Sequence, residues 1–184
     1  MTLDPLRWAR FYAGVKHAGQ TYSGGLPYTH HLVAVDGVLV RFETGILRDL
    51  LKRMPTATAA EFFFHLREAA YLHDVVEDTR GTEQPVQVKD VAEMFGDVVA
   101  GLVDALTKDA EGNRAAKAAL NYPRLRAVHG AVTLKLADRI ANVEQGGGLD
   151  RMYRKEREDF RRALYTPGEN EALWAHLDAL FVTG

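Results

Sequence analysis

The sequence contains no cysteine, which removes a whole branch of protein chemistry. Disulfide bonds, cysteine-ligated zinc sites and thiol nucleophiles are all excluded. The sequence also lacks a long apolar run: no segment approaches the roughly 20 residues of a membrane-spanning helix. The first residues, Met-Thr-Leu-Asp-Pro-Leu-Arg-Trp, have no apolar signal core. We therefore expect a cytoplasmic protein without a membrane partner.

An excess of charge of one sign is missing as well. The 23 Lys and Arg residues nearly balance the 25 Asp and Glu residues, which leaves a net charge of -2. The most basic stretch, residues 151–162, interleaves its arginines with acidic residues and is typical of a solvated helix face. Without an unbalanced basic face, we expect no nucleic-acid partner.

The pattern of apolar residues predicts an all-α protein. With 184 residues, no internal repeat and no linker between two cores, the chain is expected to form one domain over residues 1–184. A chain of this size buries about 70% of the surface of its unfolded state. Helices are predicted over residues 4–18, 60–77, 88–94, 98–106, 132–143, 149–164 and 169–181.

One stretch, residues 32–42, supports two readings. Its apolar residues flank Asp36-Gly37, and local rules slightly favour a hairpin around this turn. The same residues also place an apolar stripe on one face of a helix that begins near His31. Residues 42–55 follow as an apparent insertion, so a short hairpin or irregular segment is expected before the next motif.

The most informative segment is 69–79, where an apolar helix carries His73-Asp74 and, one turn later, Glu77-Asp78. Residues four apart share a helix face. Uncompensated charges are costly to bury, and carboxylates this close repel one another. A divalent cation removes both costs, so the segment predicts a metal site with a second carboxylate pair beside it.

A metal site needs further ligands, and two residues qualify. His31 follows the turn-like residues 24–28, where a starting helix would project it inward. Asp138 sits in the apolar segment 133–142, which leaves little room for an unpaired carboxylate. Two imidazoles and two carboxylates suit a first-row divalent ion such as Mn, Fe, Co or Zn, with positions left open for water and substrate.

A purely structural explanation exists for each of these residues. His73 can be a core histidine with satisfied hydrogen bonds, and Asp138 can form a buried salt bridge with Arg139 or Lys135. Each explanation is adequate for a single residue. Together, an apolar helix that bears one His and three acidic residues, and a second apolar helix that bears an Asp, favour the metal site.

Four stretches in this order carry a family resemblance: 17–31 (His-Ala-Gly-Gln…Pro-Tyr-Thr-His-His), 72–79 (Leu-His-Asp-Val-Val-Glu-Asp-Thr), 94–108 (Met-Phe-Gly-Asp…Leu-Thr-Lys) and 134–142 (Leu-Lys-Leu-Ala-Asp-Arg-Ile-Ala-Asn). The chain resembles the HD-domain hydrolases of the RelA/SpoT type, in particular the small stand-alone alarmone hydrolases. The resemblance covers most of the chain up to about residue 145.

The resemblance implies an all-helical fold that holds one Mn²⁺ ion through four ligands: His31, His73, Asp74 and Asp138. It further implies that Glu77 and Asp78 orient and deprotonate the attacking water. The reaction it implies is removal of the 3′-pyrophosphate from guanosine tetra- or pentaphosphate. Asn142 matches a position that contacts the sugar of this small-molecule nucleotide.

The chain departs from the family pattern at the edges of the expected pocket. Tyr22 and Ser23 stand where the family carries an Arg-Lys pair against the base, and Glu144 stands where an arginine is frequent. Tyr22 can stack on a base, whereas Glu144 is expected to repel phosphate. These departures weaken the alarmone as the specific substrate.

Three cations are further candidates for substrate contacts. Lys108 ends a predicted helix and can reach a phosphate, although a lysine at a helix C-terminus is also favoured by the helix dipole. Lys135 and Arg139 flank Asp138 and can serve substrate phosphates or pair with carboxylates.

Three functions therefore remain open. The first is a Mn-dependent hydrolase of an alarmone, which the Glu77-Asp78 pair favours. The second is the same chemistry on another nucleotide, such as an adenosine counterpart, NADPH or a deoxynucleotide, which Tyr22, Ser23 and Glu144 favour. The third is a nucleotide-sensing module that has lost turnover. The sequence leaves the metal, the exact nucleotide, the pathway and the oligomeric state open.

Overall fold

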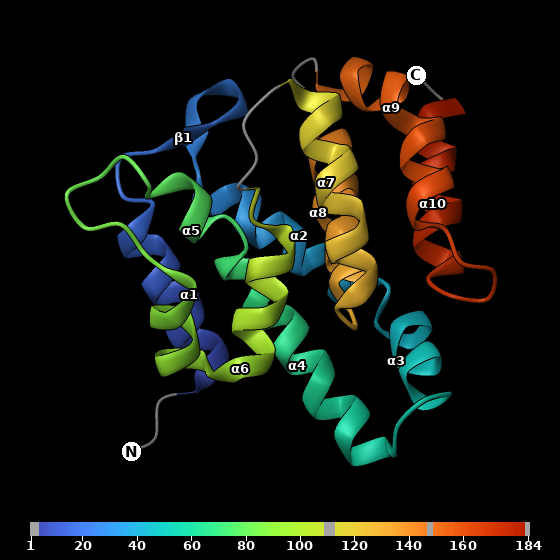
Figure 1. Cartoon of the computed structure of the whole chain (residues 1–184), viewed down its shortest axis with the longest axis horizontal. Helices are drawn as coiled ribbons and strands as arrows, with labels where there is room; N and C mark the ends of the chain where they lie inside the picture. The colour runs from blue at the N-terminus through green and yellow to red at the C-terminus, as the bar shows by residue number, and fades with distance from the viewer. Residues whose placement is uncertain (1–3, 109–112, 147–148, 183–184) are drawn as a thin grey trace.

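A computed structural model describes residues 4–108, 113–146 and 149–182. Three helices form its centre: α2 (Thr29–Arg41), α4 (Thr56–Leu72) and α8 (Ala131–Gln145). They pack against one another, α1 and α6 pack on α4, and α9 and α10 pack on α8 (Figure 1). The all-α fold class predicted from the sequence is confirmed.

The remaining elements surround this centre. In chain order they are α1 (Pro5–Lys16), β1 (Thr21–Tyr22), the 3₁₀ turn η1 (Ser23–Gly25), β2 (Leu26–Pro27), α3 (Glu43–Leu51), α5 (Val75–Asp78), α6 (Val88–Leu106), α7 (Arg114–Ala127), α9 (Leu149–Leu164) and α10 (Glu171–Val182). Helix α7 was not predicted. It crosses in front of α8 in Figure 1 and closes one side of the site described below.

Local chemistry explains where several helices begin and bend. The side chain of Asp4 accepts a hydrogen bond from the backbone N–H of Leu6, and Pro5 occupies the first helical position of α1. Gln87 and Asp90 form a reciprocal cap on α6. The break predicted near Phe95-Gly96 is a kink, because Gly96 has φ 83° and ψ 165° inside α6.

The hairpin reading of residues 32–42 is wrong, since this stretch is the helix α2. Asp36, the expected turn residue, is buried and accepts hydrogen bonds from Arg67 (2.7 and 3.0 Å) and from the hydroxyl of Tyr71 (3.0 Å). These partners lie more than thirty residues away, so local turn rules do not see them. The insertion that follows is mostly the helix α3.

The predicted helix 60–77 is interrupted at His73-Asp74, which separate α4 from α5. Both residues keep right-handed backbone angles, and the N–H of Asp78 still donates to the carbonyl of Asp74 (2.8 Å). The interruption therefore keeps the helical hydrogen bond between Asp78 and Asp74, and His73 is buried beside it.

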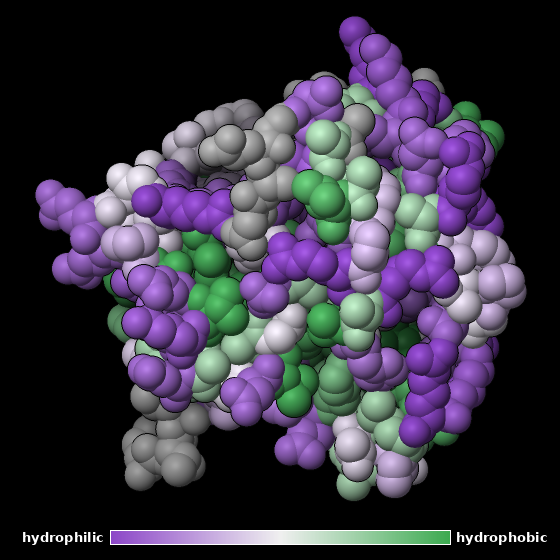
Figure 2. Space-filling model, in the orientation of Figure 1, coloured by the Kyte–Doolittle hydropathy of each residue, from purple (hydrophilic) through white to green (hydrophobic). Residues whose placement is uncertain are grey.

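Buried apolar side chains from α1 through α10 form one continuous cluster around α2, α4 and α8. On the face seen in Figure 2, hydrophobic residues are scattered between hydrophilic ones. Within the described residues, every helix is too short or too polar to cross a membrane. The cluster makes the three central helices a rigid frame for the side chains that they carry.

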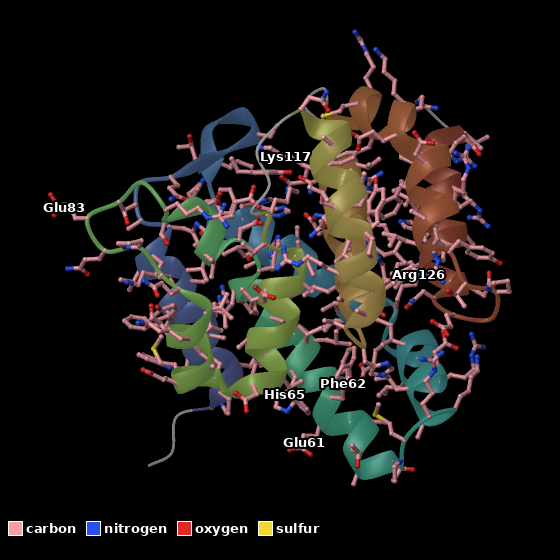
Figure 3. All side chains as sticks on the ribbon, in the orientation of Figure 1. Glu61, Phe62, His65, Glu83, Lys117 and Arg126 are labelled. Atoms are coloured by element: carbon pink, nitrogen blue, oxygen red, sulfur yellow. The ribbon has the colours of Figure 1, made fainter. Side chains whose placement is uncertain are left out.

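A tight approach between helices generates the first prediction. Gly130 precedes α8 with φ +80°, and a Cβ placed there would lie 2.8 Å from Cε1 of Phe62, a residue of α4 labelled in Figure 3. Gly130→Ala combines backbone strain with this clash. We expect it to lower the free energy of unfolding by about 1–3 kcal/mol in urea denaturation.

The matched control is Gly37→Ala, in the exposed face of α2, where an added Cβ meets nothing within 4 Å. Removing backbone freedom there is expected to stabilise the protein by about 0.5–1 kcal/mol. Equal effects of the two substitutions would contradict the packing described between α4 and the start of α8.

Candidate metal centre

Four predicted ligands converge from three parts of the chain. His31 comes from the first turn of α2, His73 and Asp74 from the junction of α4 and α5, and Asp138 from the middle of α8. Ligand atoms of His31, His73 and Asp74 lie within 4.8 Å of one another. Nε2 of His31 is 3.4 Å from Oδ1 of Asp138 and 3.7 Å from Oδ2 of Asp74. This group of residues can bind a metal.

The hydrogen bonding of His73 tests whether a cation fits here. Its Nδ1 lies 2.9 Å from the carbonyl oxygen of Ala70, an acceptor, so Nδ1 carries a proton. In the neutral ring, Nε2 then carries a lone pair, and this nitrogen is buried without a hydrogen-bond partner. It faces Oδ2 of Asp74 at 2.9 Å, so two acceptors confront each other. A divalent cation between them satisfies both, and the residues therefore fit a metal.

Neighbouring groups hold the two carboxylates in place. The hydroxyl of Tyr28 donates to Oδ2 of Asp74 (2.6 Å). Lys135 donates to Oδ2 of Asp138 (2.7 Å), and the amide of Asn142 donates to Oδ1 of Asp138 (2.6 Å). Such supporting contacts orient metal ligands and tune their affinity. Asp138 thus forms the expected salt bridge with Lys135 and at the same time lies beside the other predicted metal ligands.

The charges in this space shift the pKa of His73 and of the two carboxylates. Burial lowers the pKa of His73, but the Asp74 and Asp138 carboxylates outweigh burial and raise the pKa to about 9. Burial raises the pKa of Asp138, yet Lys135 and the two imidazoles outweigh it and hold the value well below the usual range. Burial also raises the pKa of Asp74, but His73 outweighs it and lowers the value. Both carboxylates are therefore ionised at neutral pH, as metal ligands must be.

The second acidic pair, Glu77-Asp78, lies next to the ligands. The backbone N–H of Lys108 donates to Oε2 of Glu77 (3.3 Å), and Nζ of Lys108 is 3.7 Å from Oε1. Burial, followed by the charge of Asp74, raises the pKa of Asp78. A carboxylate whose pKa moves toward neutrality is a better proton acceptor for a water molecule.

A cleft of about 420 Å³ opens over these groups. Its size is in the range of small-molecule sites. Both acidic and basic side chains line it, and the basic ones lie mainly on α7 and α8. Lys117, near the N-terminal end of α7, is labelled in Figure 3. The lining includes Tyr22, Tyr28, His31, Asp74, Glu77, Asp78, Lys108, Lys117, Asn121, Tyr122, Lys135, Asp138, Arg139, Asn142, Tyr153 and Glu156.

Five of the six predicted substrate contacts line this cleft: Tyr22, Lys108, Lys135, Arg139 and Asn142. Ser23 lies in the η1 turn and is not part of the lining. Arg139 is buried between aromatic rings, 3.6 Å from the ring centre of Phe160 and 4.6 Å from that of Tyr153. Its Nε and Nη1 have no hydrogen-bond partner among the described residues.

The expectation that Glu144 repels phosphate is wrong. Arg41 donates to both carboxylate oxygens of Glu144 (2.8 and 2.9 Å), and Nε2 of His176 lies 2.7 Å from Oε1. These partners come from α2 and α10, which the sequence pattern did not place beside the end of α8. Glu144 therefore ties three helices together and does not line the cleft.

Sequence reasoning missed several residues of the site. Tyr28 belongs to the quoted Pro-Tyr motif but was read only as part of a turn, whereas its hydroxyl holds Asp74. Asn121 and Tyr122 lie on the unpredicted α7. Tyr153 and Glu156 lie on α9, in the run read as a solvated face. Their spacing of three residues, with Phe160 four further on, was the available signal for a buried stripe.

No family model matches the chain. Several curated proteins, however, are similar to it in sequence. The bifunctional (p)ppGpp synthase/hydrolase SpoT of Escherichia coli K12 is 31% identical over 171 residues, covering 88% of this chain and 21% of its own length. The GTP pyrophosphokinase Rsh of Brucella ovis is 31% identical over 153 residues, covering 77% of this chain and 17% of its own. The chain thus spans about a fifth of the length of these proteins.

A solved structure of a metazoan ortholog of SpoT, described as hydrolyzing ppGpp with a role in starvation responses, superposes with a TM-score of 0.72. The alignment covers 100% of this chain and 97% of the other, at 24% identity. The chain is similar to the SpoT-type proteins over most of its own length. It has their helical HD-domain fold, and the resemblance predicted from four stretches of sequence is confirmed.

The proton on His73 generates a prediction about metal binding. Below a pKa of about 9 this ring carries a proton on Nε2, which competes with the metal. The affinity for Mn²⁺ is therefore expected to rise between pH 6 and 8 by about tenfold per unit, with one proton released per ion. Isothermal titration calorimetry in buffers of different ionisation enthalpy measures both quantities.

His65→Gln is the matched control, because Nδ1 of His65 lies 3.0 Å from Glu68 on α4, outside the cleft. The control is expected to show the same pH dependence as the unchanged protein. An affinity that stays constant from pH 6 to 8 would contradict the protonated state of His73 described above.

Proposed function

We propose that this protein is a metal-dependent phosphohydrolase that removes the 3′-pyrophosphate from guanosine tetraphosphate or pentaphosphate. The observation that carries the proposal is the shared cleft, which His31, Asp74 and Asp138 of the predicted ligand group line together with Glu77 and Asp78. His73 lies directly behind, with ligand atoms within 4.8 Å of those of His31 and Asp74. The names of relatives such as the guanosine-3′,5′-bis(diphosphate) 3′-pyrophosphohydrolase of Escherichia coli O157:H7 support it.

The acidic pair divides its work between positioning and proton transfer. Asp78, with its raised pKa, accepts a proton from the attacking water. Glu77 is fixed through the backbone and side chain of Lys108 and orients that water. When bound, the divalent ion lowers the pKa of water and offsets charge on the attacked phosphorus. A site built only for binding has no need of this pair.

The rest of the cleft suits a phosphorylated nucleotide. Lys117 and Arg139 supply positive charge in the cleft, and aromatic rings of Tyr22, Tyr122 and Tyr153 offer surfaces for a base. Because Glu144 is paired outside the cleft, it does not oppose phosphate. One of the departures that weakened the alarmone assignment is thereby removed.

The proposal also covers the metal ion, the domain, the location and the partners of the enzyme. We propose Mn²⁺ as the ion, since the mixed imidazole and carboxylate donors suit a first-row divalent metal, and other ions of this group fit the same donors. We also propose one HD-type domain over residues 1–184, in the cytoplasm, that acts on a small-molecule nucleotide without a nucleic-acid or membrane partner. The balanced charge and the single apolar cluster support this setting.

A second candidate keeps the chemistry and changes the nucleotide. Tyr22, with an aromatic ring in place of a cation, lines the cleft on the side of His31. A less phosphorylated purine compound, such as NADPH, needs fewer cations there. The guanosine compound remains the first choice because three lysines and one arginine line the cleft.

The deciding experiment is a product-resolved assay of Mn²⁺-loaded protein with guanosine tetraphosphate, its adenosine counterpart and NADPH. The variant Glu77→Gln with Asp78→Asn is expected to lose at least about 100-fold in turnover, because it removes the proton acceptor. Its metal ligands remain, so Mn²⁺ binding is expected to persist.

The matched control, Glu83→Gln with Asp97→Asn, removes two acidic charges at exposed positions outside the cleft. Its turnover is expected to equal that of the unchanged protein. Faster turnover of NADPH than of guanosine tetraphosphate would favour the second candidate. Metal binding without turnover of any compound would contradict the hydrolase and favour a nucleotide-sensing module.

A further inference from the structure

Tyr22 makes two contacts with the metal-ligand set from outside it. Its ring stacks on the imidazole of His31, with ring centres 4.8 Å apart and an angle of 21° between the planes. Its hydroxyl donates to Oδ1 of Asn142, a residue of α8 that lies 120 positions further along the chain. Tyr22 therefore touches one ligand of α2 directly and reaches α8 through one side chain.

The orientation of Asn142 is fixed by what surrounds it. Its Nδ2 donates to Oδ1 of Asp138 (2.6 Å) and to the Asp138 carbonyl (2.9 Å), both of which can only accept. The amide oxygen therefore points the other way, where the hydroxyl of Tyr22 donates to it. A continuous chain of donors runs from Tyr22 through Asn142 to the carboxylate of Asp138.

The segment that carries Tyr22 is itself held tightly. Strands β1 and β2 pair Tyr22 with Leu26, and the η1 turn between them uses Gly24 and Gly25 at φ 73° and 78°. After this short loop, Tyr28 donates to Asp74. The segment therefore contacts the ligand group at both ends. Tyr22 reaches it through Asn142 of α8, and Tyr28 contacts Asp74 at the start of α5. Figure 1 shows the segment above α5.

We propose that Tyr22 is a positioning residue of the metal centre. Its ring sets the plane of His31, and its hydroxyl orients Asn142 and, through it, Asp138. The proposal rests on the metal site proposed above. It also adds a role for Asn142: because the amide nitrogen serves Asp138 and the amide oxygen accepts from Tyr22, Asn142 supports a ligand and keeps only the second lone pair of that oxygen for a sugar hydroxyl.

The test is Tyr22→Phe, which keeps the stacked ring and removes only the hydroxyl. Supporting contacts of metal ligands are worth about 10–100-fold in affinity, and we expect the affinity of Tyr22→Phe for Mn²⁺ to fall by about tenfold. Tyr22→Ala removes the ring as well, and its affinity for Mn²⁺ is expected to fall further. Binding is measured from the electron paramagnetic resonance signal of free Mn²⁺ during a titration.

The matched control is Tyr71→Phe. Its buried hydroxyl also donates to a carboxylate, Asp36 (3.0 Å), but neither residue lines the cleft. We expect Tyr71→Phe to lower the melting temperature and to leave the affinity for Mn²⁺ unchanged. The comparison separates loss of a buried hydrogen bond in general from loss of metal-ligand positioning.

Kinetics at saturating Mn²⁺ provide the second readout. If Tyr22 positions the ligands, excess metal restores most of the turnover of Tyr22→Phe with an unchanged KM. An unchanged Mn²⁺ affinity with a raised KM would overturn the proposal and make Tyr22 a substrate contact. If the protein without any substitution binds no Mn²⁺, the proposed function itself is overturned. Failure of the Tyr22 proposal and failure of the proposed function are therefore distinguishable.

Discussion

Nε2 of His73 and a carboxylate oxygen of Asp74 face each other at 2.9 Å in a buried space, and in the neutral ring both are acceptors. Asp138 adds a second carboxylate 3.8 Å from the same nitrogen. Such a group is stable only with a positive charge inside it, either a proton on His73 or a metal ion. Competition between proton and metal for this space is the constraint on which the rest of the site depends.

The fold serves this constraint by bringing three helices to one point. The donors on α2, α8 and the α4–α5 junction are far apart in the chain, and tight packing of the central helices fixes their separation. Hydroxyl, amide and ammonium groups from Tyr28, Asn142 and Lys135 then orient the carboxylates. Asp78, which we propose as the proton acceptor, is positioned by the same junction, because its backbone N–H donates to the carbonyl of Asp74.

Sequence patterns were sufficient wherever the signal is local or carried by motifs. The helical periods, the kink at Gly96 and the placement of His31 beside Asp138 follow from spacing, apolar context and resemblance. Features that depend on distant partners were not predictable in this way. Asp36 is a turn residue by local rules but is buried by an ion pair with Arg67, and Glu144 faces α2 and α10 because of helix packing.

The central claim is that four side chains from three parts of the chain hold one metal ion, and anomalous diffraction from crystals grown with Mn²⁺ tests it most directly. The account predicts one peak per chain, about 2.0–2.6 Å from Nε2 of His31 and His73 and from one oxygen each of Asp74 and Asp138. A peak outside the cleft, or a salt bridge between Lys135 and Asp138 with no peak beside it, would contradict the account.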